Sequence, residues 1–317
     1  MINEKDYFKI RINSVHPSSP IPFDIFISLN KKFVHYLRAG QSITPEKLYS
    51  FQQKAQDQFY IPIDQRQIYK DYVADRVRSR DLSTMEKAVL LRESSISLVE
   101  ELFENPDVAT ALQESRPIVN NFVDLMDEEP AAMSHLISLS SHDFYTYNHS
   151  LDVCIYALGL GQAVGFNQMD LKELGEGALF HDIGKRNVNV DIICKAGPLD
   201  DVEWAQMQKH PQFGLQILME QDVTEGVMAS CYEHHESWSG GGYPQDLEED
   251  EIHPMARIVA IVDTYDALTT KRTYNQPMSP KDAVQFMESK LFGKYDPDMM
   301  RAMSTVLFKM QKELSKL

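Results

Sequence analysis

The sequence is poor in features that would place the protein in other classes. Its longest apolar stretches are short and interrupted, so none can span a bilayer, and the first ten residues, MINEKDYFKI, lack the apolar centre of a signal peptide. The three cysteines form neither a disulfide framework nor a CxxC pair, which indicates reduced thiols used for packing. We therefore expect a cytoplasmic protein with no membrane segment.

Excess positive charge is also lacking. The chain has 31 Lys and Arg residues against 47 Asp and Glu residues, a formal net charge of -16. Binding to long nucleic acid depends on many basic contacts to phosphates, so this balance argues against such a partner. A small dianionic ligand needs only a local cluster of positive charge, to which Lys185, Lys271 and Arg272 would contribute.

The 317 residues suffice for more than one domain, and the pattern changes near residue 80. Apolar residues alternate with polar ones at Phe8–Ile12 and again at Ile25–Leu29, which is typical of half-buried strands. Thr44 and Pro45 open an expected helix. We predict a mainly α protein with a small α+β domain at residues 1–75, a helical connector at 76–127 and a helical bundle at 128–317.

The connector starts at a capping box. Ser83 and Glu86 form the S-x-x-E pattern ahead of an apolar run, and almost everything from there to the end has helical periodicity. A dimerising coiled coil is the alternative for these helices, but sustained heptads are missing. We interpret them as connector and bundle packing and leave the oligomeric state open.

The most informative feature is a series of metal-ligand types in the C-terminal half. Imidazole nitrogen is a borderline donor and carboxylate a hard one, so a set of five histidines and two aspartates suits iron, manganese or zinc better than calcium or copper. Two adjacent pairs within one stretch are unusual for histidines that only fill a core. The series is His149, His181, Asp182, His210, His234, His235 and Asp263.

The residues around this series carry a family resemblance. The chain reads HDIGK from His181 and HHESWSGGGYP from His234, and YTYNHS precedes the first histidine. From about residue 145 to the C-terminus it resembles the HD-GYP family, a branch of the HD superfamily of metal-dependent phosphohydrolases. The resemblance implies an all-helical domain with two divalent metal ions, iron in the first place and manganese or zinc as alternatives. It also implies a phosphodiesterase that linearises cyclic di-GMP.

The resemblance further implies a role for each motif residue. Asp182 bridges two ions; His149, His181 and Asp263 complete one ligand set, and His210, His234 and His235 the other. Two cations about 3.5 to 4 Å apart turn a bridging water into hydroxide near neutral pH and neutralise phosphoryl oxygens. Asp182 and Lys185 are the candidate catalytic residues. The candidate substrate contacts are Lys185, Arg272, Gly241, Gly242, Tyr243 and Asp266.

The chain departs from the family pattern at three positions. Ser237 stands where Arg or Lys is usual, Ser239 where Asp is usual, and Asn275 where Arg or Lys ends the RPYR or RPYK motif. We therefore expect slow turnover. Two alternatives stay open: a degenerate signalling protein that acts by ligand binding or protein contacts, and an HD-type hydrolase for another nucleotide. Protein partners would bind through the N-terminal domain or the loop at 239–244.

Some members of the family place a Glu four residues before the first histidine, where it recruits a third ion. This chain has Tyr145 at that position. A neutral phenol, with a pKa near 10, is a poor ligand at physiological pH, so the sequence predicts two metal ions rather than three.

Overall fold

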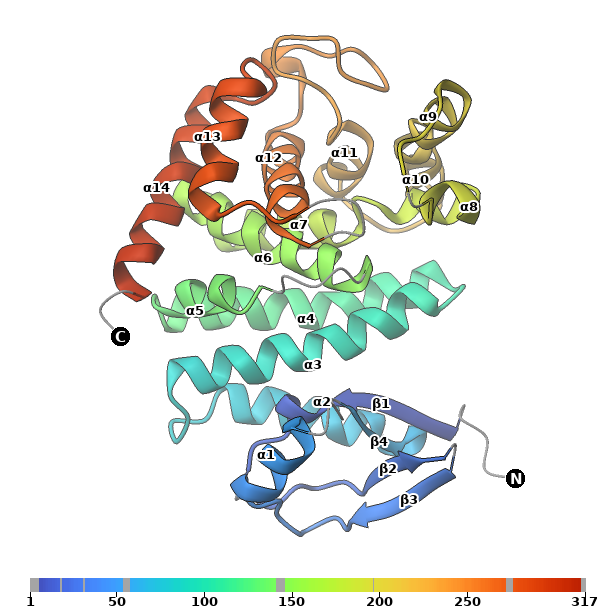
Figure 1. The fold of residues 1–317 in the computed structure, drawn as a ribbon, viewed down its shortest axis with the longest axis vertical. Helices are drawn as coiled ribbons and strands as arrows, with labels where there is room; N and C mark the ends of the chain where they lie inside the picture. The colour runs from blue at the N-terminus through green and yellow to red at the C-terminus, as the bar shows by residue number, and fades with distance from the viewer. Residues whose placement is uncertain are drawn as a thin grey trace. The chain divides into compact units, whose positions relative to one another are not determined.

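The computed structural model describes residues 6–17, 19–30, 32–53, 58–140, 146–195, 197–271 and 276–314 (Figure 1). The chain divides into two compact units, one of Met1–Glu101 with Asp124–Leu139 and the other of Leu102–Val123 with Ser140–Leu317. The long helices α3 (Thr84–Glu104) and α4 (Val108–Glu128) therefore contribute residues to both. The domain limits derived from the sequence, after residues 75 and 127, stay predictions.

The first unit is built on an antiparallel sheet in the order β1-β4-β2-β3. Alternation places Phe8 and Ile10 on one face of β1, opposite Ile61 and Phe59 of β4, and all four are buried. Two helices, α1 and α2, pack aromatic side chains on this face. The elements are β1 (Tyr7–Arg11), β2 (Ile25–Leu29), β3 (Lys32–Leu37), α1 (Pro45–Gln53), β4 (Gln58–Pro62), α2 (Arg66–Val77) and α5 (Ala132–Ser138).

The predicted fold class is confirmed in its main features. Period-two alternation correctly indicated the first two strands, and α1 starts at Pro45 as the Thr-Pro pair predicted. The capping box before α3 is formed, because the backbone N–H of Ser83 donates to Glu86 Oε2 at 2.9 Å and that of Glu86 donates to Ser83 Oγ at 3.3 Å. Within the described residues, no helix is both long and apolar enough to cross a membrane.

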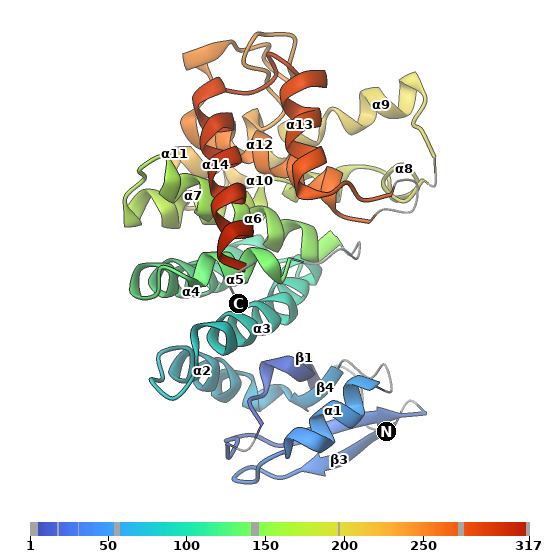
Figure 2. The same ribbon diagram turned by 60° about the vertical axis from the view of Figure 1, so that its left-hand side comes forward.

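The second unit is helical. Its central helices contact one another: α6 packs on α7 and α12, while α11 packs on α7, α10 and α12. Figure 2 shows α13 and α14 beside α12, and both contact it. The elements are α6 (Thr146–Ala163), α7 (Gln168–Phe180), η4 (Ile183–Asn187), α8 (Val190–Ile193), α9 (Asp201–Met207), α10 (His210–Leu218), α11 (Glu225–Glu233), η5 (Glu249–Glu251), α12 (Pro254–Thr269), α13 (Pro280–Lys290) and α14 (Pro297–Leu314).

Helix ends decide where the polar side chains of this unit lie. Gly165 ends α6 with a φ of 93°, a left-handed conformation that glycine adopts without a steric penalty. Asn167 caps α7 and Asp200 caps α9, each through a capping box. Thr224 precedes α11, but its side chain makes no capping hydrogen bond. At the other ends of these helices, His181 directly follows α7 and His234 directly follows α11.

Candidate metal and active site

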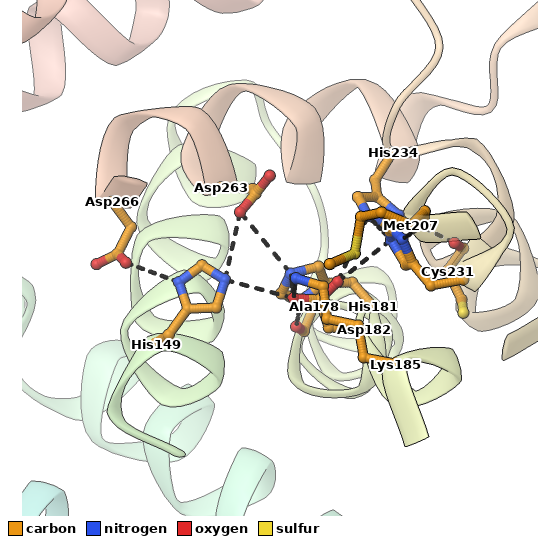
Figure 3. Close-up of polar contacts among 11 residues, drawn as sticks. His149, Ala178, His181, Asp182, Lys185, Met207, Cys231, His234, Asp263 and Asp266 are labelled. Carbon is orange, nitrogen blue, oxygen red and sulfur yellow. Dashed lines mark hydrogen bonds and ion pairs between the residues drawn. The ribbon is translucent and has the colours of Figure 1, made fainter. Parts of the chain in front are cut away.

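All seven predicted metal ligands meet in the second unit. Figure 3 shows five of them: His149, His181, Asp182, His234 and Asp263. His149 lies in the first turn of α6, and His181 ends α7, directly before Asp182. His210 is the first residue of α10, where Pro211 occupies a position that needs no N–H donor. His234 and His235 follow α11, and Asp263 lies on α12. Five helices thus contribute residues to the site.

Asp182 lies between two groups of histidines. Its Oδ2 is 3.4 Å from His181 Nε2 and 3.7 Å from His149 Nε2. Its Oδ1 is 3.3 Å from His210 Nε2 and 3.9 Å from His234 Nε2. Each carboxylate oxygen therefore faces its own group, which is the geometry of a bridging ligand. The fifth histidine, His235, belongs to the second group with His210 and His234.

Hydrogen bonds at Nδ1 set the tautomers of four histidines. In His181, His210 and His234, Nδ1 lies 2.7 to 2.9 Å from a backbone carbonyl three residues earlier. A carbonyl can only accept, so each Nδ1 carries hydrogen and, in the neutral ring, leaves a lone pair on Nε2. His149 Nδ1 is 2.7 Å from Asp266 Oδ2, a carboxylate in the same role. These Nε2 atoms are the ones that face Asp182.

The protonation states suit cation binding. Burial lowers the pKa of His210 to about 4 and that of His235 to about 3, so both rings are neutral at pH 7. Burial also lowers the pKa of His234, and the neighbouring histidines lower it further. Burial alone would raise the pKa of Asp182, but the charges of Lys185 and His181 hold it well below its ordinary value. Asp182 is therefore anionic, and His210, His234 and His235 are neutral.

His149 differs from the other histidines. Burial alone would lower its pKa, but the carboxylates of Asp182, Asp263 and Asp266 outweigh burial and raise it well above the ordinary value. Its Nε2 lies 3.3 Å from Asp263 Oδ1. A proton on this ring offsets the negative charge of the carboxylates. A metal ion that bound there would displace that proton.

Gly184, which sequence reasoning did not single out, sets the distance between the two groups. A Cβ at this position would lie 1.9 Å from His210 O and 2.4 Å from Gly214 N, so only glycine lets η4 pack directly on the start of α10. This contact brings His210 beside Asp182. The signal was present as the glycine of HDIGK, but nothing in the local sequence shows which segment it approaches.

Asp266 occupies a position other than the one expected. It was a candidate substrate contact, yet it is 1% exposed. Its Oδ2 binds His149 Nδ1, and its Oδ1 accepts from Thr270 Oγ1 at 3.1 Å. This geometry favours orienting the His149 ring over touching a substrate, in the way that carboxylates hold metal-binding histidines elsewhere.

Lys185 lies on the same side of Asp182 as His149 and His181. Its Nζ donates to Asp182 Oδ2 at 2.5 Å, and its side chain is 34% exposed. The residue belongs to the 3-10 helix η4, so its separation of three residues from Asp182 returns it to the same face. The ammonium group is thus held at the bridging carboxylate with part of its surface open.

The glycine loop, residues 239–244, is anchored by Glu236. Glu236 is 2% exposed, and its two carboxylate oxygens accept from the backbone N–H of Gln245 at 2.6 Å and of Leu247 at 3.1 Å. Gly242 packs so closely that a Cβ would lie 2.5 Å from Glu236 Cα, whereas a Cβ at Gly241 would meet open space. Glu236 is the second residue that sequence reasoning missed, although it stands in the HHE motif.

Tyr243, in the glycine loop, packs its aromatic ring against His235. The Tyr243 ring stacks on His235 at 4.7 Å between centroids, and Trp204 of α9 contacts Tyr243 edge-on at 6.4 Å. The backbone N–H of Tyr243 donates to His235 O at 3.2 Å. Tyr243 therefore holds His235 in place from the side of the loop.

We expect Glu236→Gln to loosen this loop. The amide offers N–H where the two backbone N–H groups need an acceptor, which should lower the free energy of unfolding by about 1 to 3 kcal/mol. Urea unfolding followed by circular dichroism measures the change. Glu220→Gln, at an exposed position on the turn after α10, is the control. Equal unfolding curves for both variants would show that the two contacts do not hold the loop.

Three positions discussed from the sequence, Arg272, Asn275 and Tyr145, lie outside the described residues. Their predicted roles stay predictions.

Comparison with known proteins settles the family. The HD domain family matches residues 131–299, which is more than half of the chain. The chain belongs to the HD domain family. An HD domain implies divalent metal binding, and the two residue groups around Asp182 fit a metal site.

Curated relatives of this HD domain are cyclic-dinucleotide phosphodiesterases by name. A cyclic di-GMP phosphodiesterase of Pseudomonas aeruginosa is 35% identical over 187 residues, covering 56% of this chain and 45% of that protein. A 3'3'-cGAMP-specific phosphodiesterase of Vibrio cholerae is 30% identical over 237 residues, covering 70% of this chain and 50% of that protein. The aligned region thus spans half or less of the length of each relative. The resemblance indicated by the motifs is confirmed.

The fold is shared almost end to end with one solved structure. Bd1817, a HDG"Y"P protein from Bdellovibrio bacteriovorus, has a TM-score of 0.72, and the match covers 95% of this chain and 99% of that one. Sequence identity is 22%, so the likeness is one of fold. The N-terminal unit is therefore part of a shared architecture together with the HD domain.

The side chains themselves fit a metal ion. His181 Nε2 and Asp182 Oδ1 are buried and have no hydrogen-bond partner. His210 Nε2 and His234 Nε2 lie 3.3 Å apart, although both rings use Nδ1 as the donor. Buried lone pairs that point at one another without a hydrogen between them are costly unless a cation lies among them.

Proposed function

We propose that the HD domain hydrolyses a 3'-5' phosphodiester of a cyclic dinucleotide, with cyclic di-GMP as the first candidate substrate. The observation that carries the proposal is the placement of Asp182, each of whose oxygens faces a separate group of ligands. Such a site matches the chemistry named for the relatives from Pseudomonas aeruginosa and Vibrio cholerae.

The proposed ligands divide as the geometry groups them. His149, His181 and Asp263 would hold one divalent ion, and His210, His234 and His235 the other, with Asp182 between them. The mixture of imidazole and carboxylate favours iron or manganese over zinc. When bound, such a pair supplies Lewis acidity that lowers the pKa of water and neutralises phosphoryl oxygens.

Residues of this chain would prepare the site for in-line displacement at phosphorus. Asp266 holds the His149 ring in one tautomer, and three carbonyls do the same for other histidines, so little rearrangement is needed during reaction. Lys185 is placed to donate to a phosphate oxygen from the Asp182 side. Tyr243 keeps His235 in position and limits access of water from the loop side.

Two further readings are tested by the same assays. The 30% identity to the cGAMP-specific enzyme over 70% of this chain favours cGAMP as the second candidate substrate. Ser237 and Ser239, in place of charged residues, favour a slow enzyme or a receptor that binds without turnover. Protein partners that bind through the N-terminal unit or the glycine loop stay a prediction.

The direct test is turnover by metal-loaded protein. We expect purified protein reconstituted anaerobically with Fe(II) or Mn(II) to convert cyclic di-GMP to a linear product, with cyclic GMP-AMP assayed in parallel by chromatography. If the protein hydrolyses only a non-cyclic phosphate ester, the proposed substrate class is wrong. Binding of cyclic di-GMP without product would favour the receptor.

The substituted positions give a second readout of the same assay. Restoring charge with Ser239→Asp and Asn275→Arg should raise affinity or rate, since one charge orders the loop and the other binds phosphate. Ser239 is exposed, and its backbone N–H donates to Gly293 O at 3.0 Å, so a longer side chain fits there. No gain in either parameter would show that these positions do not limit the reaction.

A further inference from the structure

A tryptophan on α9 lies beside the second group of metal ligands. The Trp204 ring contacts Tyr243 edge-on, with 6.4 Å between ring centroids, and the Tyr243 ring stacks on His235 at 4.7 Å. Three residues further along the helix, the carbonyl of Met207 accepts a hydrogen bond from His210 Nδ1 at 2.8 Å. Two independent contacts, one through side chains and one through the main chain, therefore fix the position of Trp204 relative to this group.

Trp204 keeps much of its ring surface in water. Every residue of α9 is at least partly exposed, and Trp204 itself is 47% exposed. The rings of Trp204 and Tyr243 meet at 81°. Whichever of the two presents its edge, at least one face of the indole is not covered by Tyr243. An indole carries a large apolar surface, so a flat ligand that stacked on this face would gain free energy by removing it from water.

The ligand that fits such a surface is a purine base. A cyclic dinucleotide carries two flat bases that project away from its phosphates, so a base lies at the edge of a centre that holds a phosphate. Trp204 is at such a distance, because one tyrosine ring separates it from the ring of His235. The chain has a net charge of -16, and stacking on an aromatic face is a contact that needs no further cation.

We propose that Trp204 is a base-binding residue, on which one purine of the bound cyclic dinucleotide stacks while a phosphate lies at the metal ligands. The assignment rests on the proposed function. Tyr243 contacts His235 on one side and Trp204 on the other, so direct ring contacts would place the base relative to the ligand group. The contact adds affinity for purine dinucleotides over simple phosphodiesters without touching the reacting phosphorus.

The first test compares Trp204→Leu with Trp204→Phe in the metal-loaded protein. Leucine has no aromatic face, so cyclic di-GMP binding by calorimetry should weaken by about 5- to 150-fold, and KM should rise with a smaller change in kcat. Phenylalanine should restore most of the affinity. Val202→Ala, at a position that is 69% exposed on the same helix, is the matched control and should bind as wild type does. Equal affinity in Trp204→Leu and wild type would overturn the assignment.

Fluorescence gives a readout that a purely structural role would not change. The chain has two tryptophans, so Trp238→Phe leaves Trp204 as the single emitter, and Trp204→Phe shows any quenching that arises at Trp238. A guanine stacked on the Trp204 indole should quench its emission, whereas dimethyl phosphate, which has no base, should not. Unchanged Trp204 emission at saturating cyclic di-GMP would contradict the proposal. Loss of metal from Trp204→Leu in proportion to the lost affinity would also contradict it, because the ring would then only support Tyr243.

GMP separates this inference from the proposed function. If the metal-loaded wild type binds neither cyclic di-GMP nor cyclic GMP-AMP, the proposed function is wrong, and quenching of Trp204 by GMP would still support the base site. If cyclic di-GMP binds equally to wild type and Trp204→Leu, the function stands and the tryptophan has no part in it. If wild type binds neither cyclic dinucleotide and GMP leaves the Trp204 emission unchanged, both proposals fall.

Discussion

Asp182→Ala is expected to empty both metal positions at once and to lower phosphodiesterase activity by more than about 100-fold. The metal pair supplies several kcal/mol of transition-state stabilisation, and each 1.36 kcal/mol corresponds to a factor of ten in rate. Both groups depend on this carboxylate, since each of its oxygens faces one of them. Metal analysis of the purified variant, beside a wild type expected to hold about two ions per chain, measures the effect.

Two further variants make this result interpretable. Asp182→Asn keeps the size of the side chain and removes its charge, so it should also lose metal while retaining the fold by circular dichroism. Asp201→Ala, at an exposed position on α9, should keep both ions. A wild type with one ion per chain, or an Asp182→Ala protein that retains two, would rule out the bridging arrangement.

Lys185→Met should lower kcat by about 100-fold or more and leave both metal ions in place. Removing one preorganised donor to a transition-state oxyanion typically costs about 10²- to 10³-fold in kcat. Lys185 is placed for that role because its ammonium group lies 2.5 Å from the bridging carboxylate and is still partly exposed. Single-turnover measurement with metal-saturated protein separates this effect from metal loss.

The control for charge alone is Lys209→Met. Lys209 is exposed at the start of α10, one residue before His210, and makes no contact with Asp182. Its replacement should change activity less than twofold. If Lys185→Met instead loses metal in proportion to activity, the lysine serves to position Asp182 rather than to bind phosphate.

Sequence reasoning located the proposed ligands because their signals are local. His210 stands before Pro211, which favours a helix start, and the structure begins α10 there, while His234 directly follows α11. The same reasoning predicted the strands of the first unit, since alternation along β1 depends only on which face is buried. Alternation was sufficient for the strands, whereas the role of each ligand also rested on the family resemblance.

Contacts between residues far apart in the sequence could not be predicted from local patterns. Asp263 and Asp266 have the same local signal, two acids three apart on one helix, yet Asp263 faces the ligand group and Asp266 lies behind His149. Only the crossing of α6 and α12 decides between them.

The close approach of Gly184 to α10 gives the metal centre one stiff half and one adaptable half. On the stiff side, the space between Asp182 and His210 is set by main-chain atoms in direct contact, which no rotamer change can widen. On the other side, His149 and Asp263 come from separate helices and meet the centre through side chains alone. An ion of larger radius would therefore have to be accommodated at α6 and α12. Exchange of the metal for a larger one should shift these two helices before it shifts η4 or α10.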